Sequence, residues 1–402
     1  MSAALWFMIC IIMRECTEKS YVQYSQYGEE FEISEVYSMK HYVPHYYKDF
    51  ECIADKCKDS CCIGWEIDID ADTMEMYMET EGSLGQELRE NITVSEDGSD
   101  CFRLTSDERC PFLDKNNLCR LILEGGEDML CDICHLHPRF RSFLPDRCET
   151  GLGLCCEEAA RLILTDDKPF SLICTDDDGE AAVCDNETDF CYHVRDNIFA
   201  QLDKNYDIPQ ITAYLLELGE VLDGRFARGN FSPLPQFTDA DVHSPDYTAC
   251  ENIRLILSLE PLNDSWNDAC RKLLRAVSSG MNFYYDKKEQ TAYTNLLRYY
   301  VFRYFMEAAE DYSPYLKLAM AVFSADAVSY ISLACGMSVI NAACLWSKET
   351  EYSAENMEMI YDHLSQYNDE LSALNEEWNW HILFRYRVGT EYLYPADYLS
   401  QS

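Results

Sequence analysis

Four cysteines stand within eleven residues, from Cys52 to Cys62, in the order Cys-Ile-Ala-Asp-Lys-Cys-Lys-Asp-Ser-Cys-Cys. Buried cysteines that serve only as small apolar groups need no such clustering, so packing does not explain this density. The cluster therefore favours either a metal or iron–sulfur site or a set of disulfides. The redox compartment of the protein decides between these alternatives.

The length of the chain and its N-terminal residues bear on the compartment. A chain of 402 residues can form two or three domains whose cores need no disulfides. Residues 4–13 are apolar, but they lack a basic flank and a cleavage site, and a bilayer span takes about 20 residues. We expect a cytoplasmic protein whose clustered cysteines are reduced metal ligands. Disulfides in an exported protein are the alternative.

The charge of the chain restricts its partners. The formal net charge is -40, from 32 basic and 72 acidic residues. This acidity argues against nucleic acid, since binding to phosphates needs basic patches, and we expect no nucleic-acid or membrane partner. A protein that offers lysines would be attracted. A merely solvated acidic surface is the alternative.

The distribution of thiols predicts the domains. Twelve of the 21 cysteines lie between Cys52 and Cys156. We predict an extension over 1–38 that is flexible or not native, a cysteine-rich module over 39–165, an acidic linker over 166–189, and a helical domain over 190–402. The predicted fold class is mainly α, with a small α+β module and a bundle-like helical body.

Short patterns predict the elements. In the module, Asp72 and Glu75 indicate a helix start and Gly82 its end. Segments 91–95 and 100–104 flank a hairpin turn, and 157–164 has strong helix propensity. In the body, helical apolar spacing covers 190–222, 247–258, 266–277, 291–308, 315–333 and 356–374. The aromatic end, 378–398, is predicted to close the bundle as a helix or a strand.

The cysteines supply the candidate metal ligands. In the first group they are Cys52, Cys57, Cys61 and Cys62, and in the second Cys110, Cys119, Cys131 and Cys134. A turn over 114–117 should bring Cys110 and Cys119 together. Thiolates bind zinc and iron–sulfur clusters, and these eight suffice for two four-ligand sites or one site with spares. His135 and His137 are further candidates, although a satisfied polar role is favoured for each.

A pair of cysteines, Cys155 and Cys156, directly precedes the predicted helix at Glu157. A helix N-terminus favours the thiolate form, so Cys156 is a candidate ligand or reactive thiol, with a packed cysteine as the alternative. The chain has no P-loop, no complete dinucleotide fingerprint and no Cys-x3-Cys-x2-Cys run.

The order of these motifs resembles the flagellin lysine-N-methylase family. The resemblance rests on Tyr47-x2-Phe50-x-Cys52-Ile53-x3-Cys57-x-Asp59-x-Cys61-Cys62-x-Gly64-Trp65-x-Ile67-Asp68-Ile69-Asp70, Cys110-Pro111-Phe112-Leu113, Leu118-Cys119, Leu130-Cys131-x2-Cys134, Pro138-Arg139 and Gly151-Leu152-x-Leu154-x-Cys156-x-Glu158-x-Ala160-Arg161-Leu162. It covers residues 42–165, which also resemble the broader group of zinc- or iron-chelating domains. Cys155 stands where the family is expected to have serine, so the metal-binding member of the pair stays open.

The resemblance implies methyl transfer from S-adenosylmethionine to lysine ε-amines of flagellin, in a protein that holds an iron–sulfur cluster, with zinc as the alternative metal. Polar methyl transfer needs a neutral amine, so a base or a desolvating pocket must lower the lysine pKa. Glu66, Asp68 and Asp70 beside the cysteines are the first carboxylates to test, although exposed strand or cap roles are favoured. The rival function is a non-catalytic zinc- or iron-binding module that recruits a protein partner.

Overall fold

The computed structural model describes seven stretches of the chain, 40–58, 60–64, 67–95, 98–176, 183–204, 206–234 and 249–377. It also describes two short strands, β1 (Val22–Tyr24) and β2 (Glu30–Glu32), which pair antiparallel. The rest of the predicted extension and the aromatic end lie outside the described residues. The described chain is mainly α, as predicted.

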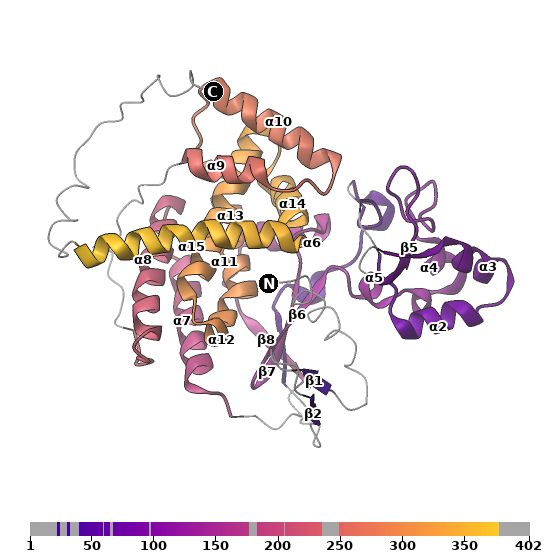
Figure 1. Ribbon diagram of the computed structural model, residues 1–402, viewed down its shortest axis with the longest axis horizontal. Helices are drawn as coiled ribbons and strands as arrows, with labels where there is room; N and C mark the ends of the chain where they lie inside the picture. Colours follow the sequence, from indigo (N-terminus) through magenta and orange to yellow (C-terminus); the bar gives the residue numbers. More distant parts are fainter. Residues whose placement is uncertain are drawn as a thin grey trace.

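A small domain projects from the side of a larger helical body (Figure 1). Its elements are α2 (Ala71–Glu79), α3 (Gly82–Asn91), β4 (Ile92–Val94), β5 (Asp100–Phe102), α4 (Arg120–Gly125), a 3-10 turn η4 (Glu127–Met129) and α5 (Asp132–Leu136). Strands β4 and β5 pair antiparallel and confirm the predicted hairpin. The predicted helix boundaries were wrong, because Asp70 rather than Asp72 caps α2, and Gly82 begins α3 rather than ending α2.

A four-stranded sheet lies between the small domain and most of the helices (Figure 1). Its strands are β3 (Lys40–Pro44), β6 (Arg139–Leu144), β7 (Arg147–Leu152) and β8 (Leu172–Asp176), in the order β6-β7-β3-β8. Strand β3 runs parallel to β7 and antiparallel to β8. Leu144 and Leu152 contribute to the core of the helical body, so this sheet packs with the body.

The helical body begins with α6 and is arranged around α13. Its helices are α6 (Glu157–Thr165), α7 (Asn186–Leu202), α8 (Ile208–Phe226), α9 (Ala249–Ser258), α10 (Asp264–Ser278), α11 (Gln290–Tyr304), α12 (Ala308–Asp311), α13 (Pro314–Cys335), α14 (Val339–Thr350) and α15 (Ala354–Glu377). Further 3-10 turns are η2 (Tyr47–Asp49), η3 (Ala54–Lys56), η6 (Lys287–Glu289) and η7 (Phe305–Glu307).

Helix α13 is long and apolar enough to cross a membrane, but 83% of its most apolar window is buried inside the protein. It packs against α8, α10, α11, α14 and α15. A helix that is apolar all round is what the centre of a large core requires. The hydropathy of α13 is therefore explained by its central position in the body.

The predicted and observed helices differ at two places for local reasons. The continuous pattern over 190–222 is broken into α7 and α8, since Asp207 caps α8 with a capping box and Pro209 lies in its first turn. Helix α14 was not predicted. Its residues 342–350 are buried all round, so the one-sided apolar spacing that marks a surface helix is weak there.

The buried apolar residues form two separate cores. The small core consists of nine residues, Ile67, Ile69, Tyr77, Leu88, Phe102, Cys110, Phe112, Leu121 and Cys131. The large core joins the sheet, α6 and the helices that follow. Buried residues within the range 39–165 thus belong partly to the small core and partly to the large core, whereas the sequence predicted one module over this range. The predicted domain boundaries themselves stay a prediction.

Candidate functional site

The loop that carries the first cysteines is attached to the N-terminus of α6. The Cys57 Sγ lies 3.7 Å from a carboxylate oxygen of Glu157, and the backbone N–H of Lys58 donates to the same oxygen at 2.8 Å. Cys52 and Cys61 are exposed in this loop. Glu157 therefore holds the Cys57 segment against the helix that Cys156 precedes.

The adjacent Cys61 and Cys62 connect this loop with the small domain. Cys62 packs against the small core, and its carbonyl oxygen accepts a hydrogen bond from the backbone N–H of Cys110 at 2.9 Å. The pKa of the Cys61 thiol is raised, first by its hydrogen bond with Cys62, while the ammonium of Lys348 in α14 opposes the rise. The two thiols are in contact with each other, and the charge of Lys348 in the helical body also acts on Cys61.

The second group of cysteines lies around the small core. Cys110 and Cys131 are buried in it, while Cys119 and Cys134 pack against it. The predicted turn is confirmed, because Leu113 and Cys119 form an antiparallel bridge and the Asp114 side chain accepts the N–H of Leu118 at 2.9 Å. The sequence thus places four thiols, together with Cys62, at one small core.

The protonation of these thiols reflects their enclosure. Burial raises the pKa of Cys110 to about 11. A hydrogen bond between Cys131 and Cys134 lowers the pKa of the first thiol and raises that of the second. Without a metal ion, Cys110 and Cys134 are neutral thiols at neutral pH, so metal binding by these two groups would release protons.

The Cys155–Cys156 pair has two different environments. The Cys155 Sγ is buried and lies 2.9 Å from the Tyr352 hydroxyl, and burial raises the pKa of this thiol to about 12. Cys156 is half-buried at the N-cap of α6. Burial is the largest cause that raises the pKa of this thiol, and negative charge on Cys61 and Cys52 raises it further. Cys155 is therefore enclosed in the body, and Cys156 is partly accessible at the start of α6.

The candidate cysteine ligands are of the chemical type that binds zinc or iron, but their side chains are not arranged as a metal site. Among the described residues, no three His, Cys, Asp or Glu side chains are already placed to hold a metal ion. Such sites often form only as the metal binds, because their ligands must first lose protons. The nine cysteine ligands accordingly stay a prediction. His135 is exposed, and burial lowers the pKa of His137 to about 4.

The three candidate carboxylates differ in their surroundings. Glu66 lies outside the described residues. Asp70 accepts hydrogen bonds from the backbone N–H groups of Thr73 and Asp132, both at 2.9 Å, so it serves as a helix cap that also positions α5. Asp68 is exposed on a short bridge to Cys101. Asp70 thus has a structural role at the start of α2 and α5, and the three carboxylates stay predictions as catalytic groups.

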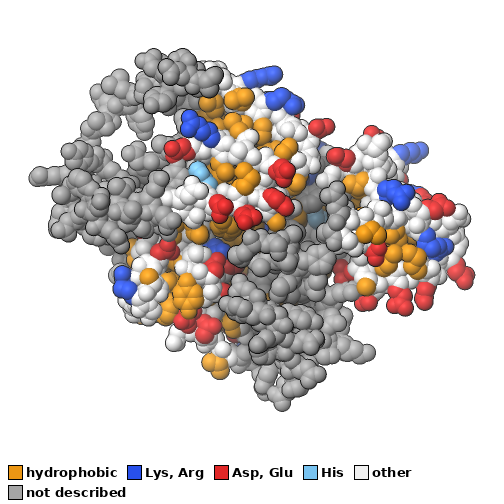
Figure 2. All heavy atoms as spheres, viewed as in Figure 1, with side chains coloured by type: hydrophobic (Ala, Val, Ile, Leu, Met, Phe, Trp, Pro, Cys, Tyr) orange, Lys and Arg blue, Asp and Glu red, His pale blue; other side chains and the backbone are white. Residues whose placement is uncertain are grey.

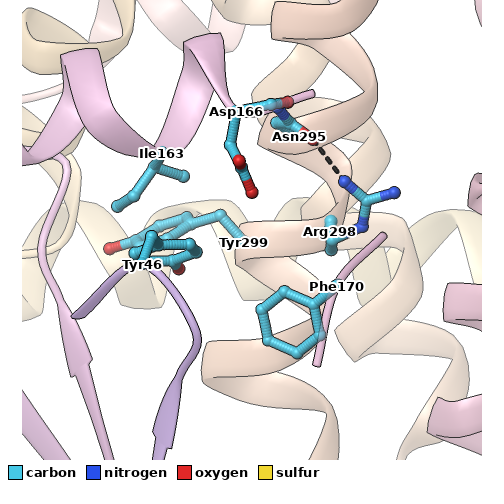
Figure 3. Close-up of a pocket in the computed structure, with 7 residues that line it drawn as sticks. All are labelled: Tyr46, Ile163, Asp166, Phe170, Asn295, Arg298 and Tyr299. Carbon is cyan, nitrogen blue, oxygen red and sulfur yellow. Dashed lines mark hydrogen bonds between the residues drawn. The ribbon is translucent and has the colours of Figure 1, made fainter. Parts of the chain in front are cut away.

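A small cavity that the sequence did not indicate lies at the end of α6 (Figure 3). It has a volume of about 10 Å³, room for about one water molecule. The lining residues are Tyr46, Ile163, Asp166, Phe170, Asn295, Arg298 and Tyr299. The cavity combines residues from three distant segments, and none of them belongs to a recognisable motif.

The cavity contains charged groups that are largely shielded from solvent. The Asp166 carboxylate lies 2.7 Å from the His45 Nε2, and Arg298 pairs with Asp203 at 2.7 Å. The Nε of Arg298 has no hydrogen-bond partner among the described residues, and a water molecule in the cavity would supply one. The space is too small for S-adenosylmethionine.

A buried carboxylate connects this cavity with the cysteine pair. The Tyr299 hydroxyl lies 3.0 Å from both carboxylate oxygens of Glu351, and the Tyr304 hydroxyl donates to one of them at 2.8 Å. Tyr299 also lines the cavity, and its hydroxyl accepts the backbone N–H of Leu154 at 3.4 Å. The network therefore fixes the backbone directly before Cys155 and Cys156.

About a third of the chain is similar in sequence to curated bacterial proteins. Lysine-N-methylases of Salmonella choleraesuis (strain SC-B67) and Salmonella typhimurium (strain LT2) are each 26% identical over 134 residues, which is 32% of this chain and 33% of each relative. The flagellar biosynthetic protein FliU of Salmonella muenchen is also 26% identical over 134 residues, 79% of its length.

These similarities are loose. The matched part of the chain spans about a third of the length of the lysine-N-methylases. No family model matches the chain, and no solved structure matches it. At this identity and coverage, the relatives support the lysine-N-methylase family only loosely and suggest methyltransferase activity weakly.

Proposed function

We propose that this chain is a protein-lysine N-methyltransferase that acts on flagellin, uses S-adenosylmethionine and holds a cysteine-ligated iron–sulfur cluster. The observation that carries the proposal is the 134-residue similarity to proteins named lysine-N-methylase. The third relative is named as a flagellar biosynthetic protein, which supports a flagellar substrate. The nine cysteines supply the ligands that a cluster requires.

The charge of the protein suits a lysine-bearing substrate. The chain carries a formal net charge of -40. Aspartate and glutamate side chains are spread over the visible face and border the small domain (Figure 2). An acidic surface of this kind attracts basic protein segments and speeds their encounter with the enzyme. The same surface disfavours the nucleic-acid and membrane partners that the sequence argued against.

The reaction itself sets requirements for the protein. The lone pair of the lysine nitrogen attacks the methyl carbon of S-adenosylmethionine, the carbon–sulfur bond breaks, and S-adenosylhomocysteine leaves as a neutral thioether. The amine must lose a proton to a base before or during this step. Asp68 is an exposed carboxylate near the first cysteines in the sequence, and it is the candidate base to test first.

Displacement at a methyl group needs no metal, so the cluster has another task. When bound, a thiolate-ligated centre supplies a rigid crosslink and a surface at which a cofactor can bind. The residues themselves fit the first task, because Cys57 contacts Glu157 in the first turn of α6, which Cys156 precedes, while Cys62 packs against the small core. A centre on these cysteines would hold the small domain against the body.

The proposal is tested by incubating anaerobically purified, metal-loaded protein with flagellin and S-adenosylmethionine. We expect lysine peptides of flagellin to gain the mass of one methyl group. Flagellin incubated with S-adenosylmethionine alone is the control, and an Asp68→Asn variant tests the base. Unmodified flagellin in the presence of fully metallated protein would overturn the proposal and favour the rival function, a metal-binding module that recruits a protein partner.

A further inference from the structure

Exposed apolar side chains gather in two regions of the molecule. Fourteen large apolar side chains among the described residues are exposed, and nine of them lie in the small domain or in the segment that begins in α10. The five in the small domain are Met78, Val94, Ile122, Leu123 and Ile133, and the four in the segment are Leu274, Val277, Met281 and Tyr284. Single exposed apolar residues need no explanation, but groups of them mark interaction surfaces.

One group belongs to an acidic face, which we define as residues 122–133 of α4, η4 and α5. Every residue from 122 to 128 is exposed, so Ile122 and Leu123 lie beside acidic side chains in solvent. The acidic residues of this face are Glu124, Glu127, Asp128 and Asp132, and the face has no lysine or arginine. Glu127 and Asp128 pair with none of the described residues. The acidic face therefore offers apolar area together with negative charge that no cation neutralises within the described chain.

The other group belongs to a basic face, which we define as residues 271–288, the end of α10 and the chain that leads into η6. Arg271, Leu274 and Arg275 are three or four positions apart, so their side chains share one side of the helix. The other side of α10 packs against α13. The backbone N–H of Met281 donates to a carbonyl oxygen in the last turn of α10 at 3.0 Å, which keeps the following chain beside that turn. Apolar and basic side chains therefore lie together at this end of the helix.

The two faces differ in charge within one strongly acidic chain. Residues 271–288 contain five basic residues and one acidic residue, whereas residues 67–136 of the small domain contain five basic and 18 acidic residues. Lys272 pairs with Asp268 at 2.7 Å, but Arg275 pairs with none of the residues that the structure describes. In Figure 2, Lys and Arg side chains border the apolar patch over α9 and α10, while Asp and Glu side chains border the small domain. The faces are thus complementary in charge, and both carry exposed apolar area.

We propose that the basic face of one copy of this chain docks on the acidic face of a second copy. Such a contact covers both groups of exposed apolar side chains and pairs Arg275 with the carboxylates of Glu127 and Asp128. Helix α10 lies at the edge of the body, and the small domain projects from another side, so the two faces are separate in one molecule (Figure 1). The contact is head to tail, and a closed pair or ring satisfies both faces of every copy. The inference does not depend on methyl transfer.

The net charge of -40 opposes association of two copies at long range. At physiological ionic strength the Debye length is about 8 Å, so charges on distant parts of the two copies are largely screened from each other. Opposite charges that meet at about 4 Å still attract, and burial of apolar side chains adds a contribution that salt does not screen. We therefore expect association at about 0.15 M salt.

Charge reversal on each face tests the proposal in the full chain. Arg275→Glu changes the basic face and Glu127→Arg changes the acidic face, and both positions are exposed. Arg228→Glu, at an exposed position just after α8 and outside both faces, is the matched control. The mass of each protein is measured by sedimentation equilibrium at about 0.15 M salt, and circular dichroism shows whether each variant is folded.

We expect wild type and Arg228→Glu to associate, and each face variant alone to associate at least about tenfold more weakly, because like charges then meet in the contact. A mixture of Arg275→Glu with Glu127→Arg should associate again, since the unchanged basic face of the second variant meets the unchanged acidic face of the first. Monomeric wild type, full association of either face variant, equal weakening by Arg228→Glu, or a mixture that stays monomeric would overturn the inference.

A second measurement uses wild type only, so it does not depend on the folding of a variant. Unlabelled and ¹⁵N-labelled chains are mixed and treated with a carbodiimide, which joins lysine amines to carboxylates in contact with them, and linked peptides are identified by mass spectrometry. Lys272, Lys287 or Lys288 of one label should be linked to carboxylates within residues 124–132 of the other. Links confined to peptides of the same label would place the contact within one chain and overturn the inference, as would the absence of links between the two faces.

Discussion

The small domain and the helical body reach stability in different ways. The body buries a long series of apolar side chains around α13 and joins its sheet to α7 through an ion pair between Glu149 and Arg195, whose side chains are each 2% exposed. The small domain has nine core residues, and its Arg120–Glu87 ion pair is about a third exposed. The body therefore has a much larger apolar core than the small domain, and we expect apolar burial alone to stabilise the small domain less.

The largest expected difference concerns one buried phenylalanine in each core. Phe112 in the small domain and Phe323 in α13 are both 0% exposed. Replacing either with alanine should cost about 4 kcal/mol of unfolding free energy through the cavity it leaves. Phe112→Ala should unfold the small domain alone, while Phe323→Ala lowers the melting temperature of a body that stays folded.

Circular dichroism during heating, combined with limited proteolysis, measures this difference. Two separate transitions in Phe112→Ala would agree with independent cores. A single transition that shifts equally in both variants would mean that the cores unfold as one unit, and the contrast between them would be lost.

The ion pairs give the next largest contrast. Arg195→Met leaves Glu149 buried, with Arg147 3.9 Å away as partial compensation, and should cost about 3 kcal/mol. Arg120→Met is the matched change in the small domain and should cost less than about 1 kcal/mol, since its pair is solvated. Urea unfolding of both variants tests this ordering, and equal costs would contradict it.

A buried carboxyl group should give the body a pH dependence. Burial raises the pKa of Asp326 to about 7, and the Tyr285 hydroxyl donates to this group. The folded protein then keeps a proton that the unfolded chain loses near pH 4. Its contribution to stability is complete below that pH and is lost as the pH rises through about 7.

Asp326→Asn cannot ionise, so it is the control for this effect. Between about pH 5 and pH 8, wild type should lose roughly 2 kcal/mol of stability relative to the variant, a value reduced for partial solvent access. Thermal unfolding across this range measures the difference. Parallel stability curves for the two proteins would show that Asp326 is already ionised at pH 5.

The smallest effect is expected at the Cys155–Tyr352 contact. Tyr352→Phe removes the hydroxyl that lies 2.9 Å from the Cys155 Sγ and should cost about 1 kcal/mol. Metal content should not change, because Cys155 is buried in the body, whereas the candidate ligand Cys156 is half-buried at the start of α6. Loss of bound metal from Tyr352→Phe would instead show that Cys155 takes part in metal binding.

The sequence predicted local structure where local chemistry determines it. The turn at Asp114, the hairpin of β4 and β5 and helix α6 follow from turn residues, alternation and helix propensity within a few positions. The division of the thiols between two cores could not be predicted, because it depends on β3 pairing with β7 across about a hundred residues. The cavity at Asp166 was missed for the same reason, since its residues come from distant segments.

Hydrogen–deuterium exchange tests the contrast between the two regions most directly. Metal-loaded and chelator-treated protein are compared peptide by peptide over the described residues. We predict that chelation increases amide exchange strongly in residues 67–136 and in the loop at 51–62, while peptides of α11, α13 and α14 exchange as before. An equal increase in the small domain and in these three helices would contradict the account.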